Sequence, residues 1–150
     1  MTSLAALLLL SVPTQATADA IDANAAADAM IAELRTQIDK PKRTLRLLVT
    51  FTVKPDREQE FVDLFGMATT KTRTEDGNIT YMMSKVYPKD GEPSQPTYVL
   101  FETWKNLDAL DQHMHTDYLA EVLTTLPEIT DEVDIKVMAP QLTKEHQRKK

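Results

Sequence analysis

The side chains that could take part in chemistry gather in two stretches, residues 78–81 and residues 102–118. The second stretch holds Glu102, Trp104 and His113. A histidine exchanges its proton near neutral pH, so a histidine beside aromatic groups is suited to proton transfer on a small molecule. Because the sequence contains no cysteine, thiol nucleophiles and zinc–thiolate sites are excluded.

The overall composition narrows the class of protein further. With 150 residues, 42% hydrophobic and 27% charged, the chain has the size and composition of one globular domain. Its net charge of -6 argues against nucleic acid as a partner, because a phosphate backbone attracts a basic surface. Its three glycines, at positions 66, 77 and 91, form neither a phosphate-binding loop nor a dinucleotide fingerprint, which argues against a flavin or nicotinamide cofactor.

Residues 1–18 have the pattern of a secretory signal peptide. An apolar run at residues 4–12, too short to span a bilayer, is followed by Ala16 and Ala18 in a small-x-small cleavage pattern. We therefore expect an exported protein, periplasmic or secreted, with no integral membrane segment after cleavage. Residues 1–3 lack the Lys or Arg usual at such a start, so a buried N-terminal helix is the alternative.

Two flanking segments lie outside the expected core domain of residues 44–140. Residues 19–43 are rich in alanine, and Ile31, Leu34 and Ile38 recur at helical spacing. This predicts a short amphipathic helix that Pro41 ends, serving as an extension that packs on the core or tethers it. Residues 141–150 form a basic tail, for which a solvated segment is the expectation.

The first half of the core domain predicts a strand followed by a helix. Apolar residues alternate from Leu45 to Val53, which predicts a strand whose odd-numbered face is the drier one. Asp56, with Gln59 three residues later, is typical of a capped helix start. We expect the helix to stop near residues 75–77, where Gly77 can supply a left-handed cap.

The second half predicts two paired strands, a helix and a last strand. The strands are expected at residues 78–87 and 96–104, with a turn between them. Asn106 is a good N-cap for the next helix, Pro127 is expected to end that region, and residues 132–138 alternate again. The order β-α-β-β-α-β predicts an α+β, ferredoxin-like fold with an antiparallel sheet and both helices on one face.

Such a sheet has one face that the two helices leave bare. Its apolar members there include Leu48, Met82, Val99 and Phe101. Two sheets packed face to face would cover these side chains, so we expect a homodimer.

The motifs on this framework resemble the antibiotic biosynthesis monooxygenase family, including its quinol monooxygenase branch. The family pattern has Glu-x-Trp at the end of a strand, then Leu, His and Ser/Thr at fixed spacing, and Gly-x-x-x-aromatic at the second strand. The likeness covers about 95 residues of the chain. The positions that carry it are Glu102, Trp104, Leu110, His113, Thr116, Gly77 and Tyr81.

The resemblance implies a dimeric α+β barrel with a small, mostly apolar pocket. Members oxidise quinols or polyketide phenols with dioxygen and without a cofactor, because a deprotonated phenol can itself pass an electron to oxygen. His113 would then be the base or orienting group. Trp104 and Tyr81 would wall the pocket against a planar substrate, and Asn106 would hold a carbonyl oxygen. Tyr118 is a further candidate for substrate binding.

Haem breakdown, which some relatives perform, is disfavoured. Those relatives place a histidine ligand further along the second helix, where this chain reads Val122–Leu123. They also carry an asparagine on the first strand, and residues 45–53 contain none.

Other interpretations of the same residues stay open. On an unbroken helix the side chain of His113 points about 120° away from the centre of the apolar stripe. A break at Thr116–Asp117 would change the direction of the second half of the helix. His115 lies nearer the stripe and is the alternative candidate for the base. Trp104 is equally suited to core packing, and Glu102 to a salt link with Arg46 or Lys85. At the level of function, the alternatives are a non-catalytic dimeric module that binds a small ligand and an isomerase that uses the same histidine.

Overall fold

The computed structural model describes residues 22–38, 42–90 and 95–138. The predicted signal peptide and the predicted basic tail lie outside these residues. Within them, no helix is long and apolar enough to cross a membrane.

A single antiparallel sheet forms the framework of the molecule, and its four strands run in the order β2-β3-β1-β4. The strands are β1 at Leu45–Val53, β2 at Asn78–Val86, β3 at Thr97–Trp104 and β4 at Thr130–Met138. Along β1 the odd-numbered residues are buried and the even-numbered ones are partly exposed, as the alternation predicts. The α+β, ferredoxin-like fold expected from the order of elements is confirmed.

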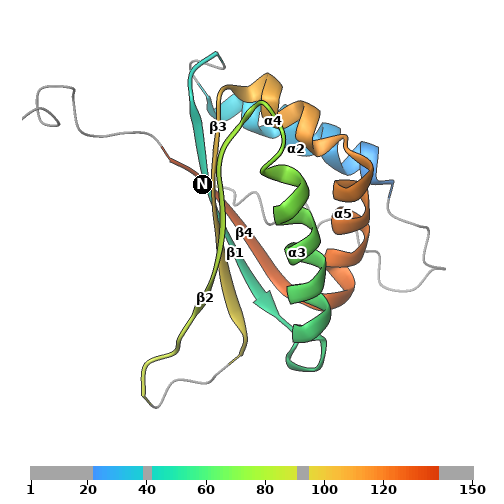
Figure 1. The fold of residues 1–150 in the computed structure, drawn as a ribbon, viewed down its shortest axis with the longest axis vertical. Coiled ribbons are helices and arrows are strands. Elements are labelled where there is room, and N and C mark those ends of the chain that lie inside the picture. Colours follow the sequence, from blue (N-terminus) through green and yellow to red (C-terminus); the bar gives the residue numbers. More distant parts are fainter. Residues whose placement is uncertain (1–21, 39–41, 91–94, 139–150) are drawn as a thin grey trace, which may run out of the picture.

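The helices lie on one side of this sheet (Figure 1). They are α2 at Ala23–Gln37, α3 at Glu58–Thr72, α4 at Leu107–Met114 and α5 at Asp117–Ile129. The apolar side chains of α3 and α5 meet the odd-numbered residues of β1 in one continuous core. The break between α4 and α5 falls at His115 and Thr116, so the predicted second helix is two helices.

Three expectations about helix ends are wrong. Asp56 does not cap a helix: residues 55–57 form a 3-10 turn, and α3 starts behind Arg57 without a side-chain cap. The backbone at Gly77 is not left-handed; the residue is needed because an added Cβ would lie 2.3 Å from the Cβ of Ala109. Pro127 does not end α5: it lies in the last turn of the helix, which continues for two more residues to Ile129.

The opposite face of the sheet carries a row of apolar side chains across three strands. Leu48 of β1 pairs with Phe101 of β3, which pairs in turn with Met82 of β2. Met82 is 50% exposed, and Leu48 and Phe101 are partly exposed. The homodimer remains a prediction, and this row of side chains is the surface that we expect to form its interface.

Candidate active site

A cavity of about 60 Å³ lies between the sheet and helices α4 and α5. Its walls are almost wholly aliphatic or aromatic, and the polar groups that reach it come from Tyr81, Glu102 and His113. Such a space has room for a small molecule or a few waters and offers that molecule few competing hydrogen bonds. Its apolar walls include Leu47, Val49, Phe51, Leu100, Leu110, Leu119, Val122 and Val133.

His113, in the last turn of α4, is the histidine that borders the cavity. Its side chain is nearly buried, and its ring lies 4.5 Å from the ring of Trp104, centroid to centroid. Its Nδ1 lies 3.1 Å from Oε1 of Glu75 and 3.2 Å from the hydroxyl of Tyr118. Both contacts use Nδ1, so Nε2 is the nitrogen left to meet a ligand.

Glu75, in the turn between α3 and β2, holds His113 in place. Burial raises the pKa of Glu75, but the hydrogen bonds from His113 and Tyr118 lower it by more, so the carboxyl stays ionised. An ionised carboxylate accepts the Nδ1 proton of a neutral imidazole and leaves Nε2 as a free base. No local sequence pattern indicates this partner, because 38 residues separate Glu75 from His113.

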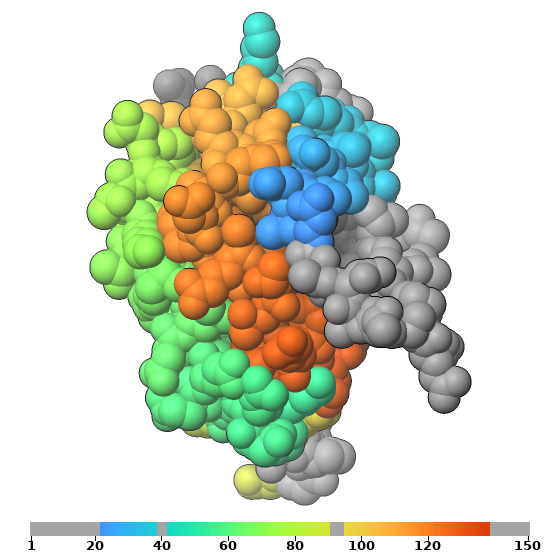
Figure 2. Space-filling view, turned by 90° about the vertical axis from the view of Figure 1, so that its right-hand side faces the viewer, coloured from blue at the N-terminus to red at the C-terminus, as the bar shows by residue number. Residues whose placement is uncertain are grey.

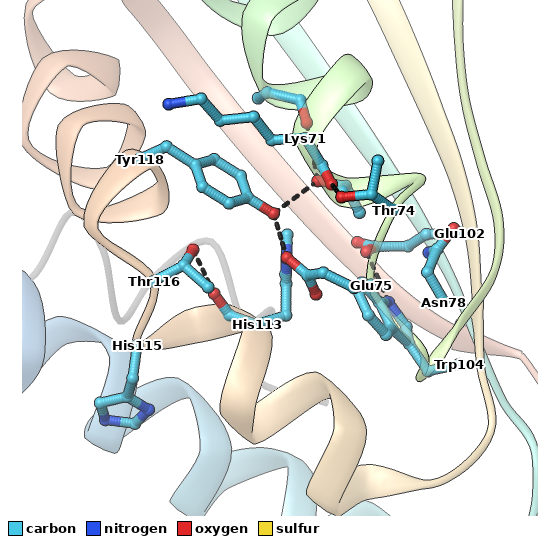
Figure 3. A network of polar contacts seen from close by, with 12 residues as sticks. Lys71, Thr74, Glu75, Asn78, Glu102, Trp104, His113, His115, Thr116 and Tyr118 are labelled. Carbon is cyan, nitrogen blue, oxygen red and sulfur yellow. Dashed lines mark hydrogen bonds and ion pairs between the residues drawn. The ribbon is translucent and has the colours of Figure 1, made fainter.

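Tyr118, at the start of α5, completes the network around Glu75 (Figure 3). Its hydroxyl donates to the Glu75 carboxylate and lies 3.0 Å from the hydroxyl of Thr72. Burial, followed by the bond to Glu75, raises the pKa of Tyr118 to about 12. Tyr118 is not among the residues that border the cavity, and its hydroxyl holds Glu75; a direct substrate contact stays a prediction.

Glu102 and Trp104 form a second buried pair on β3. The Trp104 Nε1–H donates to Oε2 of Glu102 at 2.8 Å. The expected salt link of Glu102 is wrong for Lys85, which pairs instead with Glu58 at 2.6 Å. Burial raises the pKa of Glu102, and the charge of His113 and then the hydrogen bond from Trp104 oppose that shift. The carboxyl is one of the polar groups that border the cavity.

Tyr81 of β2 borders the cavity, as expected of a wall residue. Its side chain is almost fully buried, and burial, followed by the charge of Glu102, raises its pKa well above the ordinary value. The Tyr81 carbonyl accepts two hydrogen bonds from the guanidinium of Arg73, at 3.1 and 2.9 Å. Tyr81 therefore offers a neutral phenol in a fixed position.

Two residues expected to contact substrate, Trp104 and Asn106, are not among the residues that border the cavity. Trp104 is fully buried behind Glu102 and His113 and is not a wall of the cavity, so its part is packing and the bond to Glu102. The side chain of Asn106 caps α4 by accepting from the backbone N–H of Ala109 at 2.8 Å, which confirms the predicted cap and leaves no contact with the cavity.

His115 is separated from this site despite being two residues from His113. Its Nε2 lies 3.0 Å from Oδ1 of Asp28 on α2, and its Nδ1 lies 2.8 Å from the carbonyl of Asp111. It is partly exposed and does not border the cavity. Of these two histidines, His113 borders the cavity and His115 does not.

Within the described part of the chain, no three carboxylates or histidines gather in an arrangement that could hold a metal ion. The groups described above can perform proton transfer. An imidazole, a carboxyl and a phenol border a space whose other walls are apolar.

The family model described as antibiotic biosynthesis monooxygenase matches residues 44–124 of the chain. A curated relative, an uncharacterized protein (sll1783) from Synechocystis, is 32% identical over 77 residues. That region is 51% of this chain and 49% of the relative, so the chain spans about half the length of the curated relative it matches.

Solved structures share the fold over about two thirds of the chain. A conserved protein from Methanosarcina mazei Go1 is 27% identical with a TM-score of 0.56, covering 68% of this chain and 97% of its own. A crystal structure of an antibiotic biosynthesis monooxygenase is 18% identical with a TM-score of 0.56, covering 65% and 99%. A putative antibiotic biosynthesis monooxygenase from Bacteroides thetaiotaomicron is 13% identical with a TM-score of 0.58, covering 69% and 95%.

Proposed function

Because the chain belongs to the antibiotic biosynthesis monooxygenase family, we propose that it is a cofactor-independent monooxygenase of a small quinol-like or phenolic substrate. The observation that carries the proposal is His113, bound through Nδ1 to an ionised Glu75 at the wall of an apolar cavity. This arrangement leaves Nε2 free to take the proton of a phenolic hydroxyl.

The overall reaction balances without an external reductant. A hydroquinone and dioxygen give a hydroxyquinone and water: one oxygen atom enters the ring, the other leaves as water, and the substrate supplies all four electrons. Deprotonation by His113 makes the ring electron-rich enough to pass an electron to dioxygen, after which carbon and oxygen combine. The resulting peroxide loses water as the ring hydrogen leaves as a proton.

The other residues at the cavity support this sequence of steps. A protonated Glu102 can donate a hydrogen bond to the oxygen that develops negative charge, and Trp104 holds that carboxyl in place. Tyr81 offers a second donor from β2. The aliphatic walls keep water from the reactive intermediate.

Oxygen uptake with a panel of hydroquinone, methylhydroquinone and naphthohydroquinone tests the proposal. We expect wild-type protein to consume oxygen above the autoxidation blank, and His113→Ala to lose about 10²-fold or more of that rate. Gln112→Ala, an exposed position on the same helix, is the matched control and should keep the wild-type rate.

The other outcomes identify the alternatives. Tight binding of panel members with no consumption of any of them by wild-type protein would favour a non-catalytic binding module. Loss of substrate without oxygen uptake would favour an isomerase that uses the same histidine. Equal oxygen uptake by wild type and His113→Ala would remove His113 from the mechanism.

A further inference from the structure

Helix α2 lies outside the region that defines the family, yet it is part of the core. The family match begins at residue 44, whereas α2 spans Ala23–Gln37. Its residues Ala27, Ile31 and Leu34 are buried at helical spacing. Figure 2 shows α2, in blue, lying directly against the α4 and α5 residues, in orange.

Met30 of α2 reaches the cavity. It borders the same space as His113, and among the described residues around that space it alone precedes the family match. Met114 of α4 and Leu119 of α5 border the cavity as well, so Met30 forms part of its wall together with residues of these two helices. A methionine side chain is unbranched and flexible and therefore adapts its shape to what lies beside it.

Contacts on both sides of Met30 fix the helix on which it lies. Asp28 binds Nε2 of His115 at 3.0 Å, and Arg35 binds Asp111 at 3.2 Å. Both partners of α2 are in or directly after α4, the helix that carries His113. The position of Met30 is thereby tied to the helix that presents the candidate base.

We infer that α2 is a wall of the pocket added to the family fold, and that Met30 sets the size of the aromatic molecule the pocket accepts. This rests on the proposed function in one respect, that a small aromatic ligand occupies this cavity. Shortening the side chain at position 30 enlarges the space beside His113, and a rigid ring there fills it. Differences of one or two methylene groups in an apolar pocket change selectivity by about 10-fold or more.

Binding of phenol, with one ring, and 1-naphthol, with two, tests the inference by isothermal titration calorimetry on the full chain. We expect Met30→Ala to raise the affinity ratio of 1-naphthol to phenol by about fivefold or more, and Met30→Phe to lower it. Met67→Ala is the control: it is another partly buried methionine packed on the core, from α3, that does not border the cavity. Thermal unfolding of each variant verifies that it is folded.

The outcomes separate this inference from the proposed function. If wild-type protein binds both probes and neither Met30 variant changes the ratio, the assignment to Met30 is overturned while the pocket stands. A change of ratio in Met67→Ala as large as in Met30→Ala would overturn it as well. If wild-type protein and all variants bind neither probe, the cavity is not an aromatic-ligand site, and both proposals fall together.

Discussion

The contact between Glu75 and His113 is the smallest unit on which the proposed chemistry depends. A neutral imidazole has two forms, and the one with its proton on Nδ1 is stabilised by a carboxylate at that nitrogen. Tyr118 and Thr72 hold the carboxylate from the other side. The network therefore determines which nitrogen of His113 is free to act as a base.

Replacing Glu75 by Gln tests this role directly. The amide keeps the shape but can donate as well as accept, so it no longer selects one form of the imidazole. We expect kcat for quinol oxidation to fall by about 10²-fold while KM changes little, because the cavity walls are untouched. Asp76→Asn, the next residue in the same turn and exposed, should behave as wild type. An equal loss in both variants, or a rise in KM alone, would contradict a positioning role for Glu75.

At the scale of elements, the approach of β2 to α4 depends on Gly77. The position of an added Cβ, 2.3 Å from the Ala109 Cβ, is far inside van der Waals contact. We expect Gly77→Ala to lower the free energy of unfolding by about 1–3 kcal/mol, measured by chemical denaturation. The double variant Gly77→Ala/Ala109→Gly removes the closest atom and should recover part of the loss. No destabilisation in the single variant would show that the two elements can separate at little cost.

The ion pairs between α2 and α4 make the docking of α2 depend on pH. The bond to the Asp111 backbone and then the bond to Asp28 raise the pKa of His115 above 6.5. A raised pKa in the folded state stabilises the protein below the ordinary value, and this contribution is lost as pH rises through the raised value. Asp28 and Asp111 face the ring from α2 and α4, and Arg35 lies beside Asp111 with a charge that does not titrate in this range.

Comparison of wild type with Asp28→Asn measures this effect. We expect the difference in unfolding free energy to be largest at about pH 6 and to shrink toward about pH 9. Glu33→Gln, on the same helix and without a histidine contact, should show a difference that does not vary with pH. A gap between wild type and Asp28→Asn that stays constant over this range would mean that His115 does not hold α2.

The strands were predictable from the sequence because their burial follows from local alternation. Leu45 to Val53 is buried at every second residue, which a two-residue period specifies without reference to the rest of the chain. The local sequence does not predict that α5 continues past Pro127 to Ile129, because a proline is a typical helix end. The site was predictable only in part: His113 follows from its motif, whereas Glu75 is brought to it by the packing of α3 and α4 around the sheet, which no local pattern encodes.

At the scale of the whole molecule, the exposed row of Leu48, Phe101 and Met82 is the surface on which the expected homodimer depends. Apolar side chains aligned across strands in this way are stabilised by burial against a matching surface. We expect Phe101→Glu to shift the protein from dimer to monomer in analytical ultracentrifugation, because a buried, unpaired carboxylate opposes association. Asp63→Lys, an exposed change on α3 on the helical side, is the control. A wild-type protein that sediments as a monomer would contradict the expected dimer. Export directed by residues 1–18 also remains a prediction.

We propose that this protein places one atom of dioxygen into a small aromatic substrate by means of His113. Mass spectrometry of the product formed under isotopically labelled dioxygen, by purified protein treated with a chelator, measures this directly. We expect the quinone product to carry one labelled oxygen atom, and His113→Ala to form no labelled product above the autoxidation blank. A product whose new oxygen is unlabelled, or labelled product formed equally by His113→Ala, would contradict the claim.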